Sequence, residues 1–185
     1  MRIAALALAA LALAGCADAP REEQAPLEYP LANPGFEEPV REGDCPPGWE
    51  CSAHLDPRSF RFFVSAGAPG GGKSALCVEP VKSESWALVL QGRFDPRLGG
   101  RRLRFSLDAK LTDVTGRGAG AVVRAHDGHG KRLLEKESLA TGTHEWRTLS
   151  VDFEVPSGAA EVDVGGLLEG RGRLCIDNAR VEVLP

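Results

Sequence analysis

The sequence predicts an all-β fold, a single-domain β-sandwich of the jelly-roll kind, and two observations carry that prediction. The first is composition: 43% of the 185 residues are hydrophobic, enough for a core, and the chain contains 22 glycines and 13 prolines. This content of glycine and proline disfavours long helices and favours short strands joined by turns. The second is the alternation of apolar and polar residues, which is typical of strands with one buried face. Roughly eight or nine such strands are expected.

Residues 102–110 give the clearest predicted strand. Leu103, Phe105 and Leu107 lie on one face, and charged or hydroxyl side chains occupy the other. The same alternation predicts strands over 60–64, 76–78, 86–90, 121–125, 149–155 and 162–164. Turns are expected at the glycines between these segments, at 70–72, 99–100, 127–128, 141–142, 157–158 and 169–170.

The last predicted strand contains a break in this alternation. Apolar residues occupy even positions over 174–176 and odd positions over 181–183, so the phase changes near Asp177 and Asn178. A β-bulge shifts the phase in this way and is often found beside a functional site. We therefore predict a bulge at these two residues.

Residues 1–16 predict export and a lipid anchor. Met1 and Arg2 give a positive start, and residues 3–14 form an apolar run too short to span a bilayer, as in a signal peptide. Residues 13–16, with the sequence LAGC, resemble the lipobox of bacterial lipoproteins. The resemblance implies removal of residues 1–15 and acylation of Cys16, and more than one acyl chain makes such anchoring stable. The alternative is an ordinary secretory signal with an incidental cysteine.

Ala17 bears on which membrane holds the anchor. By resemblance to the lipoprotein sorting pattern of enteric bacteria, a residue other than aspartate after the cysteine implies the outer membrane, on its periplasmic or external face. Residues 16–30 are rich in proline and charge and have no strand or helix periodicity, so we expect a flexible tether there. The β-sandwich domain is expected over 31–185. The net charge of -4 gives no reason to expect a nucleic-acid partner.

The four remaining cysteines are expected to form two disulfides in an oxidising compartment. Of the possible pairings, spacing favours Cys45 with Cys51, because the Pro-Pro-Gly segment between them can turn the chain. Cys77 would then pair with Cys175. A zinc site is the alternative, although the sequence has no CxxC pair.

Residues 67–74 match the phosphate-binding pattern G-x-x-x-x-G-K-[ST], which ends in Lys73 and Ser74. In a nucleotide-binding protein a helix begins at this lysine. Here residues 75–79 alternate as a strand and Pro80 follows, which rules out a helix at that point. We therefore expect a loop between two strands and no bound nucleotide.

Several longer segments point to a known family. Residues 31–38 (LANPGFEE), followed by Gly48 and Trp49, resemble the opening of galactose-binding-like jelly rolls, which include many carbohydrate-binding modules, and residues 173–183 resemble their closing strand. Residues 98–106, 142–146 and 165–170 are closer still to a jelly-roll module found beside bacterial hydrolases, peptidases and regulators. Because this fold hosts many activities, the resemblance bears on the fold more than on function.

The same resemblance implies a structural Ca²⁺, which many carbohydrate-binding jelly rolls hold where the opening strand, the glycine loop and the closing strand meet. The matching positions are Glu37 or Glu38, the backbone near Lys73, and Asp177. Carboxylate and carbonyl oxygens suit this hard cation. The alternative is that these carboxylates are solvated at the surface.

The residues favour binding over catalysis. No G-x-S-x-G elbow is present, and no pair of carboxylates is singled out for glycosidase chemistry. His126 and His129 have the spacing of an H-x-x-H metal site, but without a third ligand they are expected to be solvated in a hairpin turn. Trp86 shares the parity of neighbouring leucines and is expected in the core. Trp49, inside the Cys45–Cys51 loop, is the better candidate for stacking on a sugar; the alternative is that it packs over that loop as a cap.

These expectations combine into one functional hypothesis. The chain is expected to be a non-catalytic, lipid-anchored jelly roll that binds an envelope or extracellular ligand, with a carbohydrate as the candidate. The alternative is an envelope scaffold or a protein-interaction module without a sugar site, and a hydrolase is the least favoured class. The sequence does not predict an oligomeric state.

We expect a Cys16→Ser variant to leave the membrane fraction, because the acylated thiol is the predicted anchor. Membrane fractionation of cells that express the native and variant chains measures this. Tight membrane association of the Cys16→Ser variant would contradict the predicted lipid anchor.

Overall fold

The computed structural model describes residues 29–41, 43–93 and 95–185. The predicted signal peptide, Cys16 and most of the predicted tether lie outside the described residues. Within them, no helix is long and apolar enough to cross a membrane.

The described residues form an all-β domain. Its seven strands are β1 (Glu50–Ala53), β2 (Phe60–Ala66), β3 (Ser74–Pro80), β4 (Trp86–Arg93), β5 (Arg102–His126), β6 (Arg132–Glu154) and β7 (Glu161–Val183). Three short 3₁₀ turns, η1 (Pro57–Ser59), η2 (Pro69–Gly71) and η3 (Pro96–Leu98), lie in the connections.

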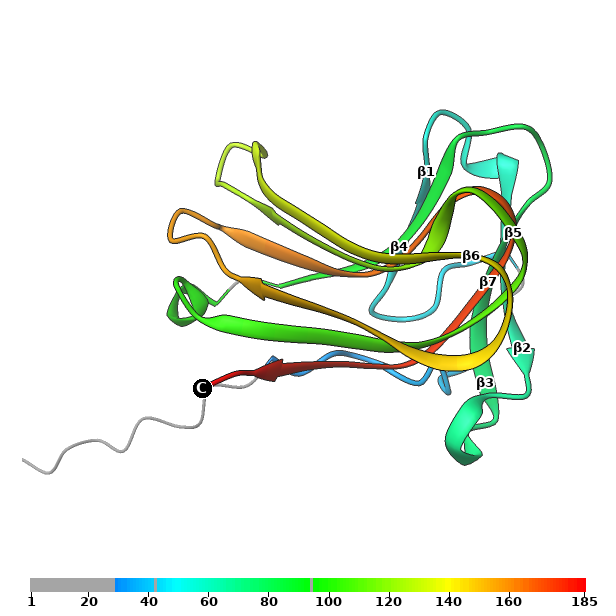
Figure 1. Cartoon of the computed structure of the whole chain (residues 1–185), viewed down its shortest axis with the longest axis horizontal. Helices are drawn as coiled ribbons and strands as arrows, with labels where there is room; N and C mark the ends of the chain where they lie inside the picture. Colours follow the sequence, from blue (N-terminus) through cyan, green and yellow to red (C-terminus); the bar gives the residue numbers. More distant parts are fainter. Residues whose placement is uncertain (1–28, 42, 94) are drawn as a thin grey trace, which may run out of the picture.

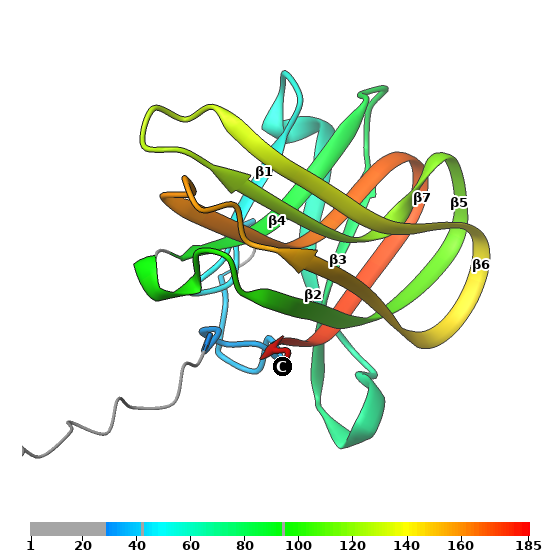
Figure 2. The same cartoon turned by 60° about the vertical axis from the view of Figure 1, so that its left-hand side comes forward.

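The strands form two layers that share β5, β6 and β7. In the first layer, residues 132–140 of β6, 118–126 of β5 and 161–169 of β7 are followed by β4 and β1. In the second layer, the other halves of the same three strands are followed by β3 and β2. Figures 1 and 2 show the three long strands curling over together from one layer into the other. This confirms the predicted β-sandwich of the jelly-roll kind.

Glycines allow these three strands to bend without separating. Gly116, Gly142 and Gly170 all have positive φ, a conformation that other residues rarely adopt. A Cβ atom on Gly170 would overlap the carbonyl oxygen of Thr115 in β5, so no other residue fits there. The turns predicted at 141–142 and 169–170 are therefore wrong: those glycines are bends inside continuous strands.

The predicted connections elsewhere agree with the structure. Loops join consecutive strands at 70–72, 99–100, 127–128 and 157–158. The P-loop-like segment joins β2 to β3, and β3 begins at Ser74, as the alternation indicated. The bulge is also confirmed, because the register between β5 and β7 shifts beside Asp177 and Asn178 has a positive φ.

The main core lies between the two layers. Leu103, Phe105 and Leu107 are fully buried there, as their alternation predicted. Tyr29, which the sequence analysis assigned to the tether, is only 3% exposed and donates a hydrogen bond from its hydroxyl to the Val162 carbonyl oxygen (2.6 Å). The packed domain therefore includes at least this residue of the predicted tether, and burial raises the pKa of the Tyr29 hydroxyl.

Both predicted disulfides are confirmed. Cys45 and Cys51 close the loop that leads into β1. Cys77 and Cys175 lie directly opposite each other on β3 and β7, within the second layer. The second bond joins positions 98 residues apart in the sequence, whereas the first spans six.

Replacing both Cys77 and Cys175 by alanine is expected to lower the free energy of unfolding by about 2–5 kcal/mol, because the unfolded chain regains the freedom of a long closed loop. Urea denaturation of the native and variant proteins measures the difference. The matched control removes Cys45 and Cys51, and its smaller loop predicts a smaller loss. Equal losses in the two variants would contradict the loop-entropy explanation.

Candidate functional site

The face of the first layer that points away from the main core is called the outer face here. Along β4, Ala87 and Val89 enter the main core, so Trp86, Leu88 and Leu90 point to the outer face. This layer is curved, and the outer face is on its concave side (Figure 1). The outer face is therefore the broad concave surface that the fold presents.

An apolar cluster forms the centre of the outer face. Leu88, Val122 and Leu167, from three neighbouring strands, are each at most 2% exposed. Trp86 and Leu139 are among the partly buried side chains packed around them. Since these residues lie outside the main core, other side chains on the same face must cover them.

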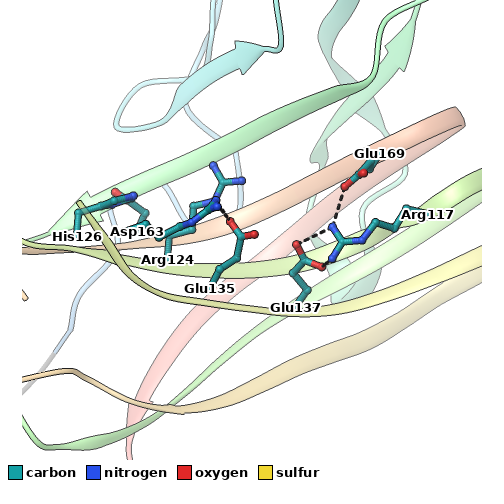
Figure 3. Close-up of polar contacts among 8 residues, drawn as sticks. Arg117, Arg124, His126, Glu135, Glu137, Asp163 and Glu169 are labelled. Atoms are coloured by element: carbon teal, nitrogen blue, oxygen red, sulfur yellow. Dashed lines mark hydrogen bonds and ion pairs between the residues drawn. The ribbon is translucent and has the colours of Figure 1, made fainter. Parts of the chain in front are cut away.

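Ion pairs span the same face (Figure 3). One guanidinium group, that of Arg117, donates to Glu137 Oε1 (3.0 Å) and Glu169 Oε2 (2.8 Å), which lie on the two strands that flank β5. The hydrogen bonds that Arg117 donates to Glu169 and Glu137 raise the pKa of its guanidinium group. Further along, Arg124 and Arg132 both donate to Glu135 Oε2, each at 2.6 Å. The outer face thus presents fixed donors and acceptors beside apolar surface.

At one end of the outer face a cavity of about 620 Å³ opens above an acidic group of residues. His126 Nδ1 lies 3.1 Å from Asp163 Oδ2, and Glu161 and Glu50 also line the cavity. Burial and the neighbouring Glu161 carboxylate raise the pKa of Asp163, and His126 acts in the opposite direction. This end therefore concentrates carboxylates around one imidazole.

The other end of the face carries the tryptophan. Trp86 is partly exposed, and its ring centroid lies 5.6 Å from that of His54. His54 Nδ1 in turn lies 3.0 Å from Glu84 Oε1. An aromatic ring flanked by polar groups is a surface on which the C–H face of a sugar can stack.

Trp49, the tryptophan predicted to contact a ligand, is buried instead. It is 7% exposed, packs 5.0 Å from the Phe36 ring, and donates from Nε1 to the Asn33 carbonyl oxygen (3.1 Å). Its role is to fasten the opening segment to the core, so its expected exposure is wrong. Trp146 also has a structural contact, because its Nε1 donates to the Gly67 carbonyl oxygen (3.1 Å).

Trp86 was expected in the core but is partly exposed on the outer face, and the sequence around it contains a signal for this. Residues 86–90 are apolar at every position, so both faces of this strand had to be covered. His126 was considered with His129, but the structure places it beside Glu161 and Asp163 of β7 instead. This contact arises because β5 pairs with β7, and the spacing of His126 and His129 in the sequence does not reveal that pairing.

The residues suggested for Ca²⁺ come together where the opening segment, the β2–β3 loop and β7 meet. Glu37 Oε1 accepts hydrogen bonds from the amides of Lys73 (2.7 Å) and Ser74 (3.2 Å). A Cβ atom on Gly72 would lie 3.0 Å from Glu37 Oε1 and 3.4 Å from Asp177 Oδ2. Both carboxylates therefore border the space beside this glycine. For Glu38 the contact found is made by its backbone amide, which donates to Asn33 Oδ1 (3.2 Å).

Asp177 fits a metal ligand by an independent observation. It is 1% exposed, and neither of its carboxylate oxygens has a hydrogen-bond partner among the described residues. Burial, together with the neighbouring carboxylates of Glu37 and Asp108, raises its pKa to about 6, although the backbone amide of Asn178 acts in the opposite direction. A buried carboxylate without partners is costly unless a cation or a proton neutralises it.

Comparisons with known proteins place the fold. No protein-family model matches the chain, and no curated protein matches it. Among solved structures, the xylan-binding domain from CBM22 is 20% identical with a TM-score of 0.57, over 80% of this chain and 91% of that one. A CBM61 module in complex with β-1,4-galactotriose is 19% identical with a TM-score of 0.55, over 86% of this chain and all of that one.

A bacteriophage CBA120 tailspike protein 4 domain, described as enzymatically active, gives a TM-score of 0.66 at 16% identity. It matches 83% of this chain, which spans only 21% of that structure. At these identities the similarity establishes the fold. The chain thus has the β-sandwich jelly-roll fold of carbohydrate-binding modules.

Proposed function

We propose that the chain is a non-catalytic carbohydrate-binding protein that uses the outer face of its first layer. The observation that carries this proposal is the combination, on one concave face, of a partly exposed tryptophan with fixed arrays of charged hydrogen-bonding groups. The fold supports it, because several structural neighbours are carbohydrate-binding modules whose names specify xylan or a galactose oligomer.

The chemistry of the face matches that of a glycan. A sugar ring has an apolar C–H face, which stacks on an indole such as Trp86, and a rim of hydroxyl groups that donate and accept hydrogen bonds. The ion pairs of Arg117 and Arg124 hold their donors and acceptors in place before binding. Such preorganisation lowers the entropy cost of binding a flexible oligosaccharide.

We further propose that the protein acts at the cell envelope. Cys16 lies outside the described residues, and its lipidation rests on the signal peptide and the lipobox resemblance. Anchored in the outer membrane through a tether, the domain would hold a surface or periplasmic glycan near the membrane. An envelope protein as ligand is the alternative. The exposed side chains Leu55 (79%) and Val81 (56%), on the loops after β1 and β3, favour that alternative as a contact surface.

We also propose that Glu37 and Asp177 hold a structural Ca²⁺, with backbone carbonyl oxygens nearby as further ligands. Oxygen ligands of this kind suit Ca²⁺. When bound, the ion would supply positive charge to the buried Asp177 carboxylate and fasten the opening segment to the β2–β3 loop and to β7. Its role would be to stabilise the fold.

Trp86→Ala is expected to weaken glycan binding by roughly tenfold or more, because it removes the stacking surface. Isothermal titration calorimetry with xylohexaose, β-1,4-galactotriose and peptidoglycan fragments measures the affinity of the full-length chain. Trp146→Ala is the matched control and is expected to bind as the native protein does.

Three results would contradict this proposal. No binding to any glycan of the panel would favour the protein-interaction alternative, and equal losses in the two tryptophan variants would place the site elsewhere. Release of new reducing ends from a bound glycan would contradict the non-catalytic assignment.

Removal of Ca²⁺ with a chelator is expected to lower the melting temperature of the native protein, and added Ca²⁺ to restore it, because the ion neutralises Asp177. Asp177→Asn is expected to abolish this response. Glu38→Gln is the matched control, since Glu37 is the residue that faces Asp177, and it should keep the response. An unchanged melting temperature on chelation would contradict the proposed Ca²⁺ site.

A further inference from the structure

We propose that His126, Glu161 and Asp163 bind a divalent transition-metal ion of the zinc kind at the cavity end of the outer face. The three residues come from the paired strands β5 and β7, in which His126 lies opposite Glu161. One imidazole nitrogen and one oxygen from each carboxylate all lie within 4.8 Å of one another. An ion about 2.0–2.2 Å from each ligand would require only small side-chain rotations from this arrangement.

The space around the carboxylates is kept open by a glycine. A Cβ atom on Gly92 of β4 would lie 2.6 Å from both Asp163 Oδ1 and Glu161 Oε1. Any larger residue at this position would push the two carboxylates away from their present positions. Two like charges are therefore held side by side, which is unfavourable without a cation between them.

The guanidinium groups near these carboxylates have other partners, and Arg93 of β4 donates to the Pro30 carbonyl oxygen (2.5 Å). His126 is the one imidazole within the group, and Glu50 adds a further carboxylate to the same cavity. Arg124 is the nearest guanidinium group on β5, and it already pairs with Glu135.

The ligand set distinguishes this site from the one at Asp177. An imidazole nitrogen with two carboxylate oxygens suits zinc and similar ions, whereas oxygen ligands alone suit Ca²⁺. Three protein ligands leave a coordination position free, and the 620 Å³ cavity above the group gives that position access to solvent or to a ligand. Metal binding at this site does not require the glycan binding proposed above.

Calorimetric titration of the full-length chain with ZnCl₂, in the presence of saturating Ca²⁺, tests the site. The native protein is expected to bind one equivalent, and His126→Gln to lose at least roughly tenfold in affinity. His129→Gln, three residues away in the neighbouring turn, is the matched control and should bind as the native protein does. Asp177→Asn should also keep zinc binding, which separates this site from the proposed Ca²⁺ site.

A second variant tests the geometry. Gly92→Ala keeps all three ligands but crowds both carboxylates, so it is expected to weaken zinc binding, and circular dichroism checks that each variant folds. Asp163→Asn serves in place of His126→Gln if that variant fails to fold. No zinc binding by the native protein, or equal binding by His126→Gln and His129→Gln, would overturn the proposal and leave His126 and Asp163 as a simple ion pair.

Discussion

The fold depends on one constraint: β5, β6 and β7 must bend over together without losing the hydrogen bonds between them. At the bend the backbones approach so closely that side chains are excluded. A Cβ atom on Gly116 would lie 2.9 Å from Gly170 Cα, and one on Gly118 would lie 2.9 Å from the Ala140 carbonyl oxygen. Because these glycines let the ladder continue through the bend, the same three strands enclose the main core and build the concave outer face.

This construction explains why the outer face has its own apolar cluster. The first layer presents Ala121 and Val123 to the main core and Val122 to the other side, so both of its faces must be shielded from water. On the outer face Trp86, Leu90 and Leu139 pack against the cluster, and arginine and glutamate side chains of the same face form ion pairs. The ion pairs of Arg117 and Arg124 therefore link neighbouring strands of the layer and set the chemistry that a bound ligand would meet.

Local pattern predicted the strands well and the bends poorly, for a physical reason. Alternation depends on which face is buried, so the strand around Phe105 was found from sequence alone. Whether a strand ends or bends at Gly142 and Gly170 depends on how it pairs with the neighbouring strand. The positions of the glycines in the sequence do not show that pairing. The same limit applies to the sites. The resemblance to carbohydrate-binding jelly rolls predicted that Glu37 and Asp177 lie close together. The contact of His126 with Asp163 follows only from the pairing of β5 with β7.

The two proposed cation sites have a similar arrangement of carboxylates around a glycine, and they differ in their ligand atoms. In each, two carboxylates converge beside a glycine whose missing side chain leaves them room, Gly72 in one and Gly92 in the other. At the first, the Asp177 oxygens are buried and without partners, so a cation there would act on the stability of the fold. At the second, an imidazole joins the carboxylates beneath an open cavity, so a metal there would face whatever occupies the outer face. The fold would thus separate a structural cation from one placed to meet a ligand.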